Sequence, residues 1–388
     1  NSVKIKIKMG NKLRQILSKE MGRQEMEHNF IASENFTSRE VMNYCGSEFT
    51  NKYAEGYPNK RYYNGCEHYD ELENYGIELV TKLYNCNFAN IQPHSGANAN
   101  LAIFKAFLKP NDVILGMDLS SGGHLSHGSP ANISGKWFDN HFYGVDVNGW
   151  LDYNQIEEKA KEVKPRLIIA GASAYPRQID FKRFREIADS VGAYLLVDMA
   201  HYSGLIAGKV YDSPLPYADF VTSTTHKTLR GARGGMILWN NEEYSKKINS
   251  GVFPGTQGGP LMNQVAGKTQ AYYEALQPDF VQYSQNVIKM SKYMCDTLKE
   301  NEIKITTDGT DSHIILIHTG DKSGAEVADK LESEHNIVVN KNSIPDDPRG
   351  VWETSGIRIG TAAMVTKVGD DEEYFRNITN KIIDVILN

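Results

Sequence analysis

Residues 166–198 read RLIIAGASAYPRQIDFKRFREIADSVGAYLLVD and give the clearest indication of fold class in the chain. Two short apolar runs, RLIIA (166–170) and YLLVD (194–198), enclose the helical pattern FKRFREIADSV (181–191). A strand, a helix and a second strand in this order predict a βαβ unit with parallel strands. Because neither run alternates apolar with polar residues, we expect helices to cover both faces of these strands.

The same alternation continues on both sides of this unit. Further apolar runs are DVILGM (112–117), DFVTS (219–223) and GGMILW (234–239), and further helical patterns are ANLAIFKAFL (99–108) and YNQIEEKAKEV (153–163). Repeated βαβ units predict an α/β fold whose large domain holds a mostly parallel sheet between helices.

The two ends of the chain have different patterns. Residues 11–28 form an amphipathic pattern that predicts a helix before the large domain. Towards the other end, the runs SHIILIH (312–318) and NIVVN (336–340) flank a helical pattern, and another helical pattern begins near Asp370. These elements predict a smaller α+β domain at the C-terminal end.

Composition and charge exclude several classes of protein. The 388 residues carry a net charge of -6 without a long run of one sign, which argues against nucleic-acid and anionic-membrane binding. Lys4, Lys6, Lys8 and Lys12 form a basic N-terminal arm, which is more typical of a solvated tail than of a nucleic-acid site. No apolar run reaches the length of a membrane span, and no secretory signal pattern is present.

The cysteines indicate a reducing compartment. Cys45, Cys66, Cys86 and Cys295 show no CxxC spacing, and the chain is no small disulfide scaffold. Free thiols are typical of cytosolic proteins. We therefore expect a cytoplasmic protein.

Three groups of residues follow or precede the predicted elements in a way that suggests a ligand site. Ligands of open α/β sheets bind beyond the carboxyl ends of the strands. Asp198 ends one strand run, Lys227 follows another, and Ser95-Gly96-Ala97 precede a helix. The small residues at that helix start leave backbone N–H groups available for an anion.

Each group also has an ordinary interpretation when taken alone. Ser95 could be a plain helix cap, Asp198 could pair with a structural arginine, and Lys227 could reach the surface. Together, however, an anion-binding helix start, a buried carboxylate and a desolvated lysine match the phosphate, the ring nitrogen and the aldehyde of pyridoxal phosphate. The combination predicts a site for this cofactor.

A zinc site is the alternative for the histidines. His124 and His127 lie three residues apart, and His201 and His226 occur elsewhere. The surrounding glycines argue against a helix at 122–128, and no HExxH or Cys-His pattern exists. We therefore expect no metal, and interpret His124 as a residue that stacks on a flat cofactor ring.

At this point the chain resembles a known family along nearly its whole length. The segments that carry the resemblance are IASENFTS (31–38), NKYAEGYPNKRYYNGCEHYDELE (51–73), QPHSGANAN (92–100), GMDLSSGGHLSHGSPANISGK (116–136), ASAYPRQIDF (172–181), LLVDMAHYSGLIAG (195–208), STTHKTLRGARGG (223–235), VFPGTQGGPL (252–261), NKNSIPDDP (340–348) and TSGIRIGT (354–361). They resemble the serine hydroxymethyltransferases, which are pyridoxal-phosphate enzymes of fold type I.

The resemblance implies a fold and a division of the chain. The large domain of such enzymes has a mostly parallel seven-stranded sheet between helices. The expected division is an N-terminal helical arm over 1–30, a large cofactor-binding domain over 31–272 and a small α+β domain over 273–388. Two positions depart from the family pattern, because Ala232 and Ala362 stand where the family usually has proline.

The resemblance also implies roles for the cofactor-site residues. Lys227 would bond to the cofactor's aldehyde, Asp198 would pair with the ring nitrogen, and His124 would stack on the ring. The remaining expected cofactor-binding residues are Ser95, Gly96, Ala97, Ser173, His201 and His226, with Tyr53 and Gly259 contributed by a second copy of the chain.

Further roles follow for the substrates. Reversible transfer of the serine hydroxymethyl carbon to tetrahydrofolate would give glycine and 5,10-methylenetetrahydrofolate. Arg358 would bind the amino-acid carboxylate, a task for which an arginine is well suited. The residues expected to bind the amino acid are Ser33, Glu55, Tyr63, His201 and Arg358. Those expected to bind folate are Glu55, Tyr62, Leu119, Gly123, Leu125 and Asn342. Those expected to take part in catalysis are Lys227, Glu55, Asp198, His124, Tyr63 and Thr224. The implied assembly is a homodimer with shared active sites, or a tetramer of such dimers.

Two alternatives stay open at this point. A folate-independent pyridoxal-phosphate aldolase or transaldolase of β-hydroxy amino acids would use the same cofactor, although Glu55, Tyr62 and Asn342 favour a folate enzyme. A non-catalytic RNA-binding protein would use the basic arm. The joint presence of Lys227 and Arg358 with Asp198 and Glu55 argues against loss of catalysis.

Overall fold

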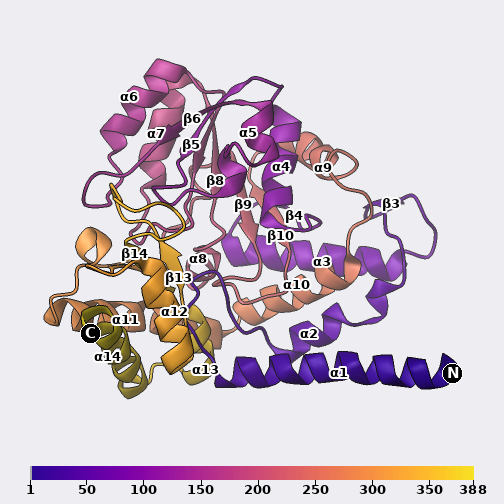
Figure 1. Cartoon of the computed structure of the whole chain (residues 1–388). Coiled ribbons are helices and arrows are strands. Elements are labelled where there is room, and N and C mark those ends of the chain that lie inside the picture. The colour runs from indigo at the N-terminus through magenta and orange to yellow at the C-terminus, as the bar shows by residue number, and fades with distance from the viewer. Residues whose placement is uncertain (1) are drawn as a thin grey trace.

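The structure is a computed structural model that describes residues 2–388, with side chains described from residue 10 onward. The side chains of Lys4, Lys6 and Lys8 therefore lie outside the described part, and the basic arm is described only at Lys12. Figure 1 shows a layered α/β body with a smaller group of helices and strands at the C-terminal end.

The described elements follow in chain order. The helices are α1 (Ser2–Met26), α2 (Arg39–Cys45), α3 (Glu67–Tyr84), α4 (Gly96–Phe107), α5 (Ile133–Trp137), α6 (Tyr153–Val163), α7 (Phe181–Val191), α8 (Ser203–Ala207), α9 (Ser245–Val252), α10 (Met262–Ala275), α11 (Pro278–Glu300), α12 (Gly324–His335), α13 (Ala362–Val368) and α14 (Glu372–Leu387). Short 3-10 turns are η1 (Glu48–Thr50), η2 (Leu125–His127), η3 (Glu242–Tyr244) and η4 (Thr306–Asp308). The strands are β1 (His28–Asn29), β2 (Gly56–Tyr57), β3 (Lys60–Arg61), β4 (Phe88–Asn90), β5 (Val113–Met117), β6 (Asp139–Tyr143), β7 (Leu167–Ala170), β8 (Tyr194–Asp198), β9 (Phe220–Thr224), β10 (Gly235–Trp239), β11 (Ile314–His318), β12 (Ile337–Val338), β13 (Asn340–Asn342) and β14 (Gly356–Gly360).

The central sheet has seven strands in the order β4-β10-β9-β8-β7-β5-β6. The five strands from β9 to β6 pair in parallel, whereas β10 runs antiparallel to β9 and β4. The predicted mostly parallel seven-stranded sheet is confirmed. The two strands outside the quoted apolar runs, β4 and β6, form the sheet edges, and β6 carries mainly polar residues.

Side chains of the central strands point alternately into two hydrophobic cores. In β7, Leu167 and Ile169 join the core beneath α4 and α9, whereas Ile168 and Ala170 join the core on the opposite face. All four residues are completely buried. Covering both faces of a parallel sheet with helices explains why its strands have continuous apolar sequences.

Helix α1 is longer at its N-terminal end than predicted, running from Ser2 to Met26 rather than from 11 to 28. Its apolar stripe is exposed: Leu13 is 70%, Ile16 52%, Leu17 58% and Met21 57% accessible. Figure 1 shows this helix extending along one edge of the molecule. The stripe therefore has no covering element in the described part of this chain, although it has the pattern of a packed helix.

The C-terminal part forms its own antiparallel sheet, in the order β11-β14-β13, and α11 packs against α13 and α14. Strand β1 pairs in parallel with β12, which connects the segment after α1 to this part. Helix α10 instead packs on α2 and α3 of the large part. This arrangement is the α+β group expected from the sequence, and the boundaries at 30 and 272 stay predictions. None of the helices in residues 2–388 has the length and apolar character needed to cross a membrane.

Candidate active site

Eight of the predicted site residues line one cavity at the carboxyl ends of the central strands. They are Gly96, Ala97, His124, Ser173, Asp198, His201, Thr224 and Lys227. His127, Ala172 and Ala200 also line the cavity and were not predicted. Residues as far apart in sequence as Gly96 and Lys227 meet here because parallel strands end at the same edge of the sheet.

Asp198 is a buried carboxylate held at the end of β8. His127 Nε2 lies 2.7 Å from Asp198 Oδ2, Asn100 Nδ2 donates to the same oxygen at 3.0 Å, and the Ala200 amide donates to Oδ1 at 3.1 Å. Burial opposes ionisation of this group, but the hydrogen bond and charge of His127 outweigh it, and the pKa of Asp198 lies well below its usual range. Asp198 therefore offers a permanent negative charge to a cationic ligand atom.

The orientation of Asn100 is fixed from the neighbouring strand. Thr222 donates its hydroxyl proton to Asn100 Oδ1 at 2.6 Å, which leaves the amide nitrogen to donate to Asp198 and to Ser126 Oγ at 2.9 Å. Asn100 lies one turn after Gly96 on α4, so the helix face that starts at the cavity also supports Asp198. Neither Asn100 nor Thr222 was predicted as a site residue. Asn100 could have been found, because it lies on the same face of the predicted helix as Gly96.

His124 precedes the 3-10 turn η2 and is neutral. Its Nδ1 accepts the Ser126 backbone N–H at 3.1 Å, so this nitrogen carries no proton and Nε2 carries the ring hydrogen. Burial lowers the pKa of His124 to about 4, despite the nearby charge of Asp198. A neutral ring fixed in this way suits contact with the face of a flat ligand.

Lys227 follows β9 and is an unusually acidic lysine. Burial lowers its pKa to about 8, the charges of Arg358 and Arg233 act in the same direction, and Asp198 opposes them. Its backbone is fixed as well, because Asn35 Nδ2 and the Arg230 amide both donate to the Lys227 carbonyl, at 3.1 and 3.0 Å. A buried lysine with this pKa has a substantial neutral fraction near neutral pH and can act as a nucleophile.

The start of α4 provides an anion cradle. Ser95 is the N-cap, and its Oγ accepts the Asn98 amide at 3.1 Å. The first amides of a helix, here those of Gly96 and Ala97, have no acceptor within the helix and point outward. A Cβ at Gly96 would lie 2.8 Å from Thr224 Cγ2, so only glycine fits against the lysine-bearing loop.

Arg358, in the middle of β14, is a cation without a carboxylate partner. Its Nη1 donates to the Ser173 carbonyl at 2.6 Å and its Nη2 to Asn340 Oδ1 at 2.9 Å, and its buried Nε has no partner. Within residues 10–388 it makes no ion pair. Burial lowers its pKa to about 10, so it stays charged and is suited to bind an incoming anion.

His201, which lines the cavity, contacts an unpredicted histidine, His313, and the charge of Arg358 acts on both. His201 Nδ1 is 3.3 Å from His313 Nε2, and the two rings stack with centroids 5.5 Å apart. Burial lowers the pKa of His201 well below its usual value and that of His313 to about 3, so both are neutral. His313 precedes β11 in the small part, and no local pattern marked it as a site residue.

A second set of predicted residues lies apart from the cavity. Tyr53, Glu55 and Gly259 lie together: a Cβ at Gly259 would be 2.9 Å from Tyr53 Cδ1 and 3.4 Å from Glu55 Cγ. Tyr63 stacks on Tyr53, and Tyr62 packs edge-on against a neighbouring phenylalanine. Within the described chain, no residue of this set lines the Lys227 cavity. The three tyrosines are 47–73% exposed.

The other predicted residues lie around the cavity. Ser33 and His226 line an open groove with Arg233, and burial lowers the pKa of His226 to about 3. The folate-set residue Asn342 lines a crevice that includes Gly122. Leu119 and Leu125 are exposed, and Gly123 donates its amide to the Asp118 carbonyl.

The two departures from the family pattern are both buried. Ala232 packs with Val41 and Ala271, and its carbonyl accepts the Thr225 hydroxyl at 2.6 Å. Ala362 is the first residue of α13, a position that accepts proline readily. In the part of the chain that the structure describes, no three His, Cys, Asp or Glu side chains are arranged to hold a metal ion.

The donor set therefore fits pyridoxal phosphate: a helix start for the phosphate, an ionised Asp198 for the ring nitrogen and a nucleophilic Lys227 for the aldehyde. The fold and this cavity define a pyridoxal-phosphate-dependent transferase of fold type I. Comparison with known proteins gives the family. The serine hydroxymethyltransferase family model matches residues 7–382, and the chain belongs to this family.

Several curated relatives carry that family's name. A serine hydroxymethyltransferase of Prochlorococcus marinus (strain MIT 9301) is 54% identical over 374 residues, which are 96% of this chain and 88% of the relative. Those of Ehrlichia canis (strain Jake) and Campylobacter hominis are 54% and 51% identical, each over 96% of this chain and 89% of the relative. The chain is thus a pyridoxal-phosphate enzyme that transfers the hydroxymethyl carbon of serine to tetrahydrofolate, and the folate-independent and non-catalytic alternatives are not supported.

Proposed function

We propose that the cavity around Lys227 is the site of this hydroxymethyl transfer. The observation that carries the proposal is that a lysine of lowered pKa and an ionised aspartate line one cavity, and that an arginine without a carboxylate partner donates to the carbonyl of Ser173 in the wall of the same cavity. Bound pyridoxal phosphate supplies the electron sink for breaking the Cα–Cβ bond of serine.

Each protein group has a separate task in this proposal. Asp198 keeps the proton on the pyridine nitrogen, because His127 and Asn100 hold the carboxylate ionised. Lys227 holds the aldehyde carbon and exchanges a proton with the amino group of the substrate. His124 presents its neutral ring to the cofactor. The phosphate is held by Ser95, Gly96, Ala97 and His226.

A further group of residues is assigned to substrate recognition. Arg358 binds the serine carboxylate through its unpartnered Nε and its terminal nitrogens, and Ser33 and His201 are assigned to the same substrate. Thr224, whose buried Oγ1 has no partner, faces the same space. The folate contacts are assigned to Tyr62, Leu119, Gly123, Leu125 and Asn342, and Ser173 adjoins the cofactor.

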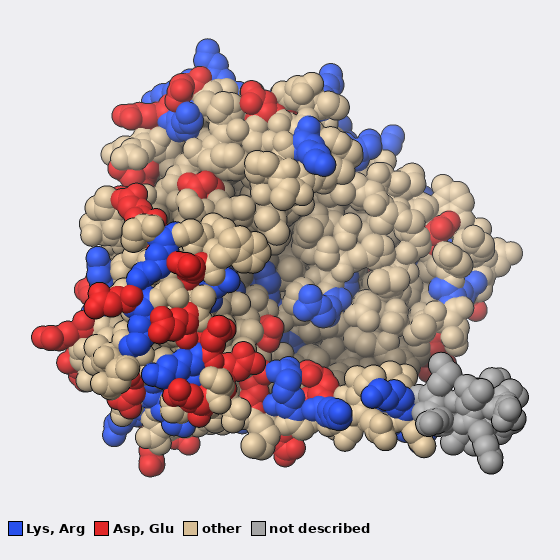
Figure 2. Space-filling view, viewed as in Figure 1, with Lys and Arg blue, Asp and Glu red and all other residues tan. Residues whose placement is uncertain are grey.

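We further propose that the enzyme is a homodimer in which Tyr53, Glu55, Tyr63 and Gly259 serve the partner's cavity. These residues form one partly exposed group, and none of them lines the Lys227 cavity of the same chain. The exposed apolar stripe of α1 supports the same conclusion, since a packed partner would cover it. Figure 2 shows a broad hollow face with few charged side chains, as expected of an interface. Within the partner's cavity, Glu55 would move the proton of the serine hydroxyl.

A cytoplasmic location completes the proposal. All four cysteines are free thiols, and free thiols are typical of reducing compartments.

The test compares the unmodified enzyme with Lys227→Ala. The unmodified enzyme is expected to develop a visible absorption band with pyridoxal phosphate and to cleave serine faster when tetrahydrofolate is added. Lys227→Ala should lose both properties. Lys289→Ala, which removes an exposed lysine paired with Asp370, is the matched control and should keep them. A full band and full turnover in Lys227→Ala would refute the proposal.

A further inference from the structure

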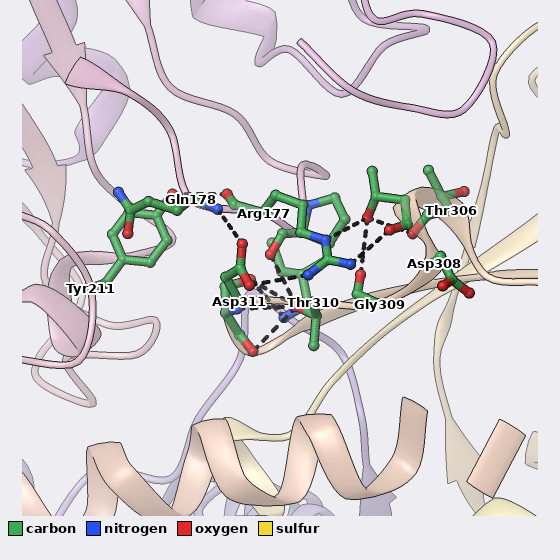
Figure 3. Close-up of polar contacts among 12 residues, drawn as sticks. Arg177, Gln178, Tyr211, Thr306, Asp308, Gly309, Thr310 and Asp311 are labelled. Atoms are coloured by element: carbon green, nitrogen blue, oxygen red, sulfur yellow. Dashed lines mark hydrogen bonds and ion pairs between the residues drawn. The ribbon is translucent and has the colours of Figure 1, made fainter. Parts of the chain in front are cut away.

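The large and small parts of the chain meet at a polar contact on one side of the active site. We call it the Arg177 junction; it consists of residues 176–178, which follow β7, and residues 306–311, which precede β11. Figure 3 shows Arg177 reaching from the large part into the turn that carries Thr306, Asp308 and Gly309. Arg177 Nη2 donates to the Thr307 carbonyl at 2.7 Å, Nε to Thr307 Oγ1 at 3.2 Å, and Nη1 to Asp311 Oδ1 at 3.1 Å.

Backbone groups complete the junction in both directions. The Gln178 amide donates to Asp311 Oδ2 at 3.1 Å, and the Asp311 amide donates to the Pro176 carbonyl at 3.0 Å. Thr310 Oγ1 donates to the same carbonyl at 3.0 Å. Since Asp311 is 40% exposed, its ion pair alone contributes little; the junction depends on the set of directed hydrogen bonds.

The turn that Arg177 holds has an unfavourable backbone. Thr307 has φ 60° and ψ 13°, Asp308 has φ 54°, and Gly309 has φ 149°. A β-branched residue at positive φ is unfavourable and persists only when its surroundings enforce it. Arg177 is one such constraint, because it binds both the carbonyl and the hydroxyl of Thr307.

Both sides of the junction lead directly into the active site. On one side, Ser173 lies four residues before Arg177, and its carbonyl accepts Arg358 Nη1 at 2.6 Å. On the other side, β11 pairs with β14 so that Leu316 lies opposite Arg358. The junction therefore sets the position of β14, and of Arg358 on it, relative to the Ser173 carbonyl.

We propose that Arg177 is a positioning residue that aligns Arg358 with the carboxylate of the amino-acid substrate. It does so by docking the 306–311 turn, and the sheet behind it, onto the loop that carries Ser173. This inference rests on the proposed role of Arg358 in carboxylate binding. It assigns Arg177 no contact with substrate or cofactor.

A loss of alignment has a specific signature. A shift of about 1 Å in a binding group can reduce an interaction's effect by about a hundredfold. We expect a milder loss, about tenfold, because Asp311 and Thr310 still hold part of the junction. The loss should fall on ligands with a carboxylate, and the cofactor and a simple amine should bind as before.

The experiment uses the holoenzyme and two amine ligands. Glycine carries the carboxylate, and ethanolamine has an alcohol in its place. Dissociation constants come from changes in visible absorption, and pyridoxal phosphate affinity from fluorescence titration of the apo-protein. Arg177→Met should lower the preference for glycine over ethanolamine about tenfold. Arg177→Lys should retain more of this preference than Arg177→Met does, because lysine keeps the positive charge. Asp311→Asn should lower the preference less than Arg177→Met does.

The control is Arg185→Met. Arg185 also bridges chain segments through an ion pair, at 2.8 Å to Asp219, and is similarly enclosed, at 22% exposure against 18% for Arg177, but it lies on α7 outside the site. It should keep the glycine preference. If Arg177→Met weakened both ligands equally, or left their ratio unchanged, the inference would be overturned. Should Arg177→Met fail to fold, Arg177→Lys and Asp311→Asn decide by the same ratio.

A further variant separates this inference from the proposed function. Arg358→Lys should itself lose most of the glycine preference. If it kept the preference of the unmodified enzyme, the assignment of Arg358 to the carboxylate would fail. If Arg358→Lys lost the preference while both Arg177 variants and Asp311→Asn kept it, only the positioning role of Arg177 would fail.

Discussion

At the scale of single residues, the site depends on ionisable groups whose charge states are set by burial. Lys227, His124, His201 and Arg358 all have lowered pKa values because burial disfavours their charged forms. Asp198 is the exception, since hydrogen bonds from His127 and Asn100 keep it ionised. An ionised carboxylate beside neutral histidines is the environment that a protonated pyridine ring requires.

The lowered pKa of Lys227 predicts the pH dependence of cofactor capture. Only the neutral amine attacks an aldehyde, so the capture rate of pyridoxal phosphate by the apo-protein should rise with pH and level off above about pH 8. Stopped-flow absorption between pH 6.5 and 9.5 measures this rate. Free Nα-acetyl-lysine, with an ordinary amine, should keep rising to about pH 10.4 under the same conditions. A protein rate that rose in parallel with the free amine would contradict the prediction.

Gly96 allows a second test at this scale. In Gly96→Ala, the new Cβ would lie 2.8 Å from Thr224 Cγ2, which displaces either the anion cradle or the lysine-bearing loop. We expect pyridoxal phosphate to bind about tenfold more weakly, a loss of about 1.4 kcal/mol, while pyridoxal without phosphate loses less. Gly22→Ala, at an open position of α1, is the control and should change neither affinity. Equal losses for both aldehydes would assign the defect to the loop instead of the cradle.

At the scale of elements, the sequence predicts what local periodicity determines. The strands β5, β7, β8, β9 and β10 have continuous apolar runs, and Asp198 and Lys227 follow such runs, so both the sheet and the cavity edge were predictable. Strands β4 and β6 were not, because edge strands are short or polar and lack that pattern. The first residues of α1 were not predicted to be helical for a similar reason, because no apolar stripe is present before Leu13.

The supporting contacts of the site could not be predicted from one sequence. His127 and Asp198 are 71 positions apart, Asn100 and Asp198 are 98 apart, and His201 and His313 are 112 apart. No spacing rule joins such residues, since their meeting depends on the completed sheet and on the docking of the small part. The roles of individual site residues remain predictions that the variants above can test.

Helix α10 contains a buried cation that links it to two other elements. Lys268 donates to the carbonyls of Ile91, Pro93 (3.3 Å) and Gly235 (3.0 Å), next to the loop that leads into α4. Three acceptors require three N–H donors, which only the ammonium form supplies. Burial nevertheless lowers the pKa of Lys268 to about 7, with the charge of Glu73 on α3 opposing it.

This lowered pKa predicts a pH-dependent stability. Between about pH 7 and 10.5 the unfolded chain keeps the Lys268 proton more often than the folded chain, so the group's contribution to stability rises with pH in that window. The free energy of unfolding of the unmodified protein minus that of Lys268→Met should therefore increase from pH 7 to pH 9, as measured by urea denaturation. Lys227 has a shift in the same direction but is present in both proteins and cancels. A constant difference would show that the three carbonyls keep Lys268 protonated throughout.

At the scale of the whole molecule, the residues proposed for the site form two groups that lie apart within one chain. Lys227 and Asp198 line the cavity and Arg358 donates to the carbonyl of Ser173 at its wall, whereas Glu55 lies with Tyr53 and Gly259 in a partly exposed group. The α1 stripe leaves further apolar surface uncovered. A symmetric dimer would complete two sites at once, because a two-fold axis brings each exposed group to the other chain's cavity.

Mixing two inactive variants tests this arrangement. Lys227→Ala lacks the lysine of its own cavity, and Glu55→Gln lacks the carboxylate that is proposed to serve the partner's cavity. In a mixed dimer, one site loses both groups and the other receives Lys227 from one chain and Glu55 from its partner. Random mixing makes half of the dimers mixed, so transfer activity should return to about a quarter of that of the unmodified enzyme. Pairing Lys227→Ala with Asp198→Asn is the matched control, because both changes lie in the cavity and every mixed dimer then has two defective sites. No recovery with Glu55→Gln after unfolding and refolding the chains together would place Glu55 and Lys227 in the same chain's site. Recovery in the control would contradict the expectation that Lys227 and Asp198 serve one site from the same chain.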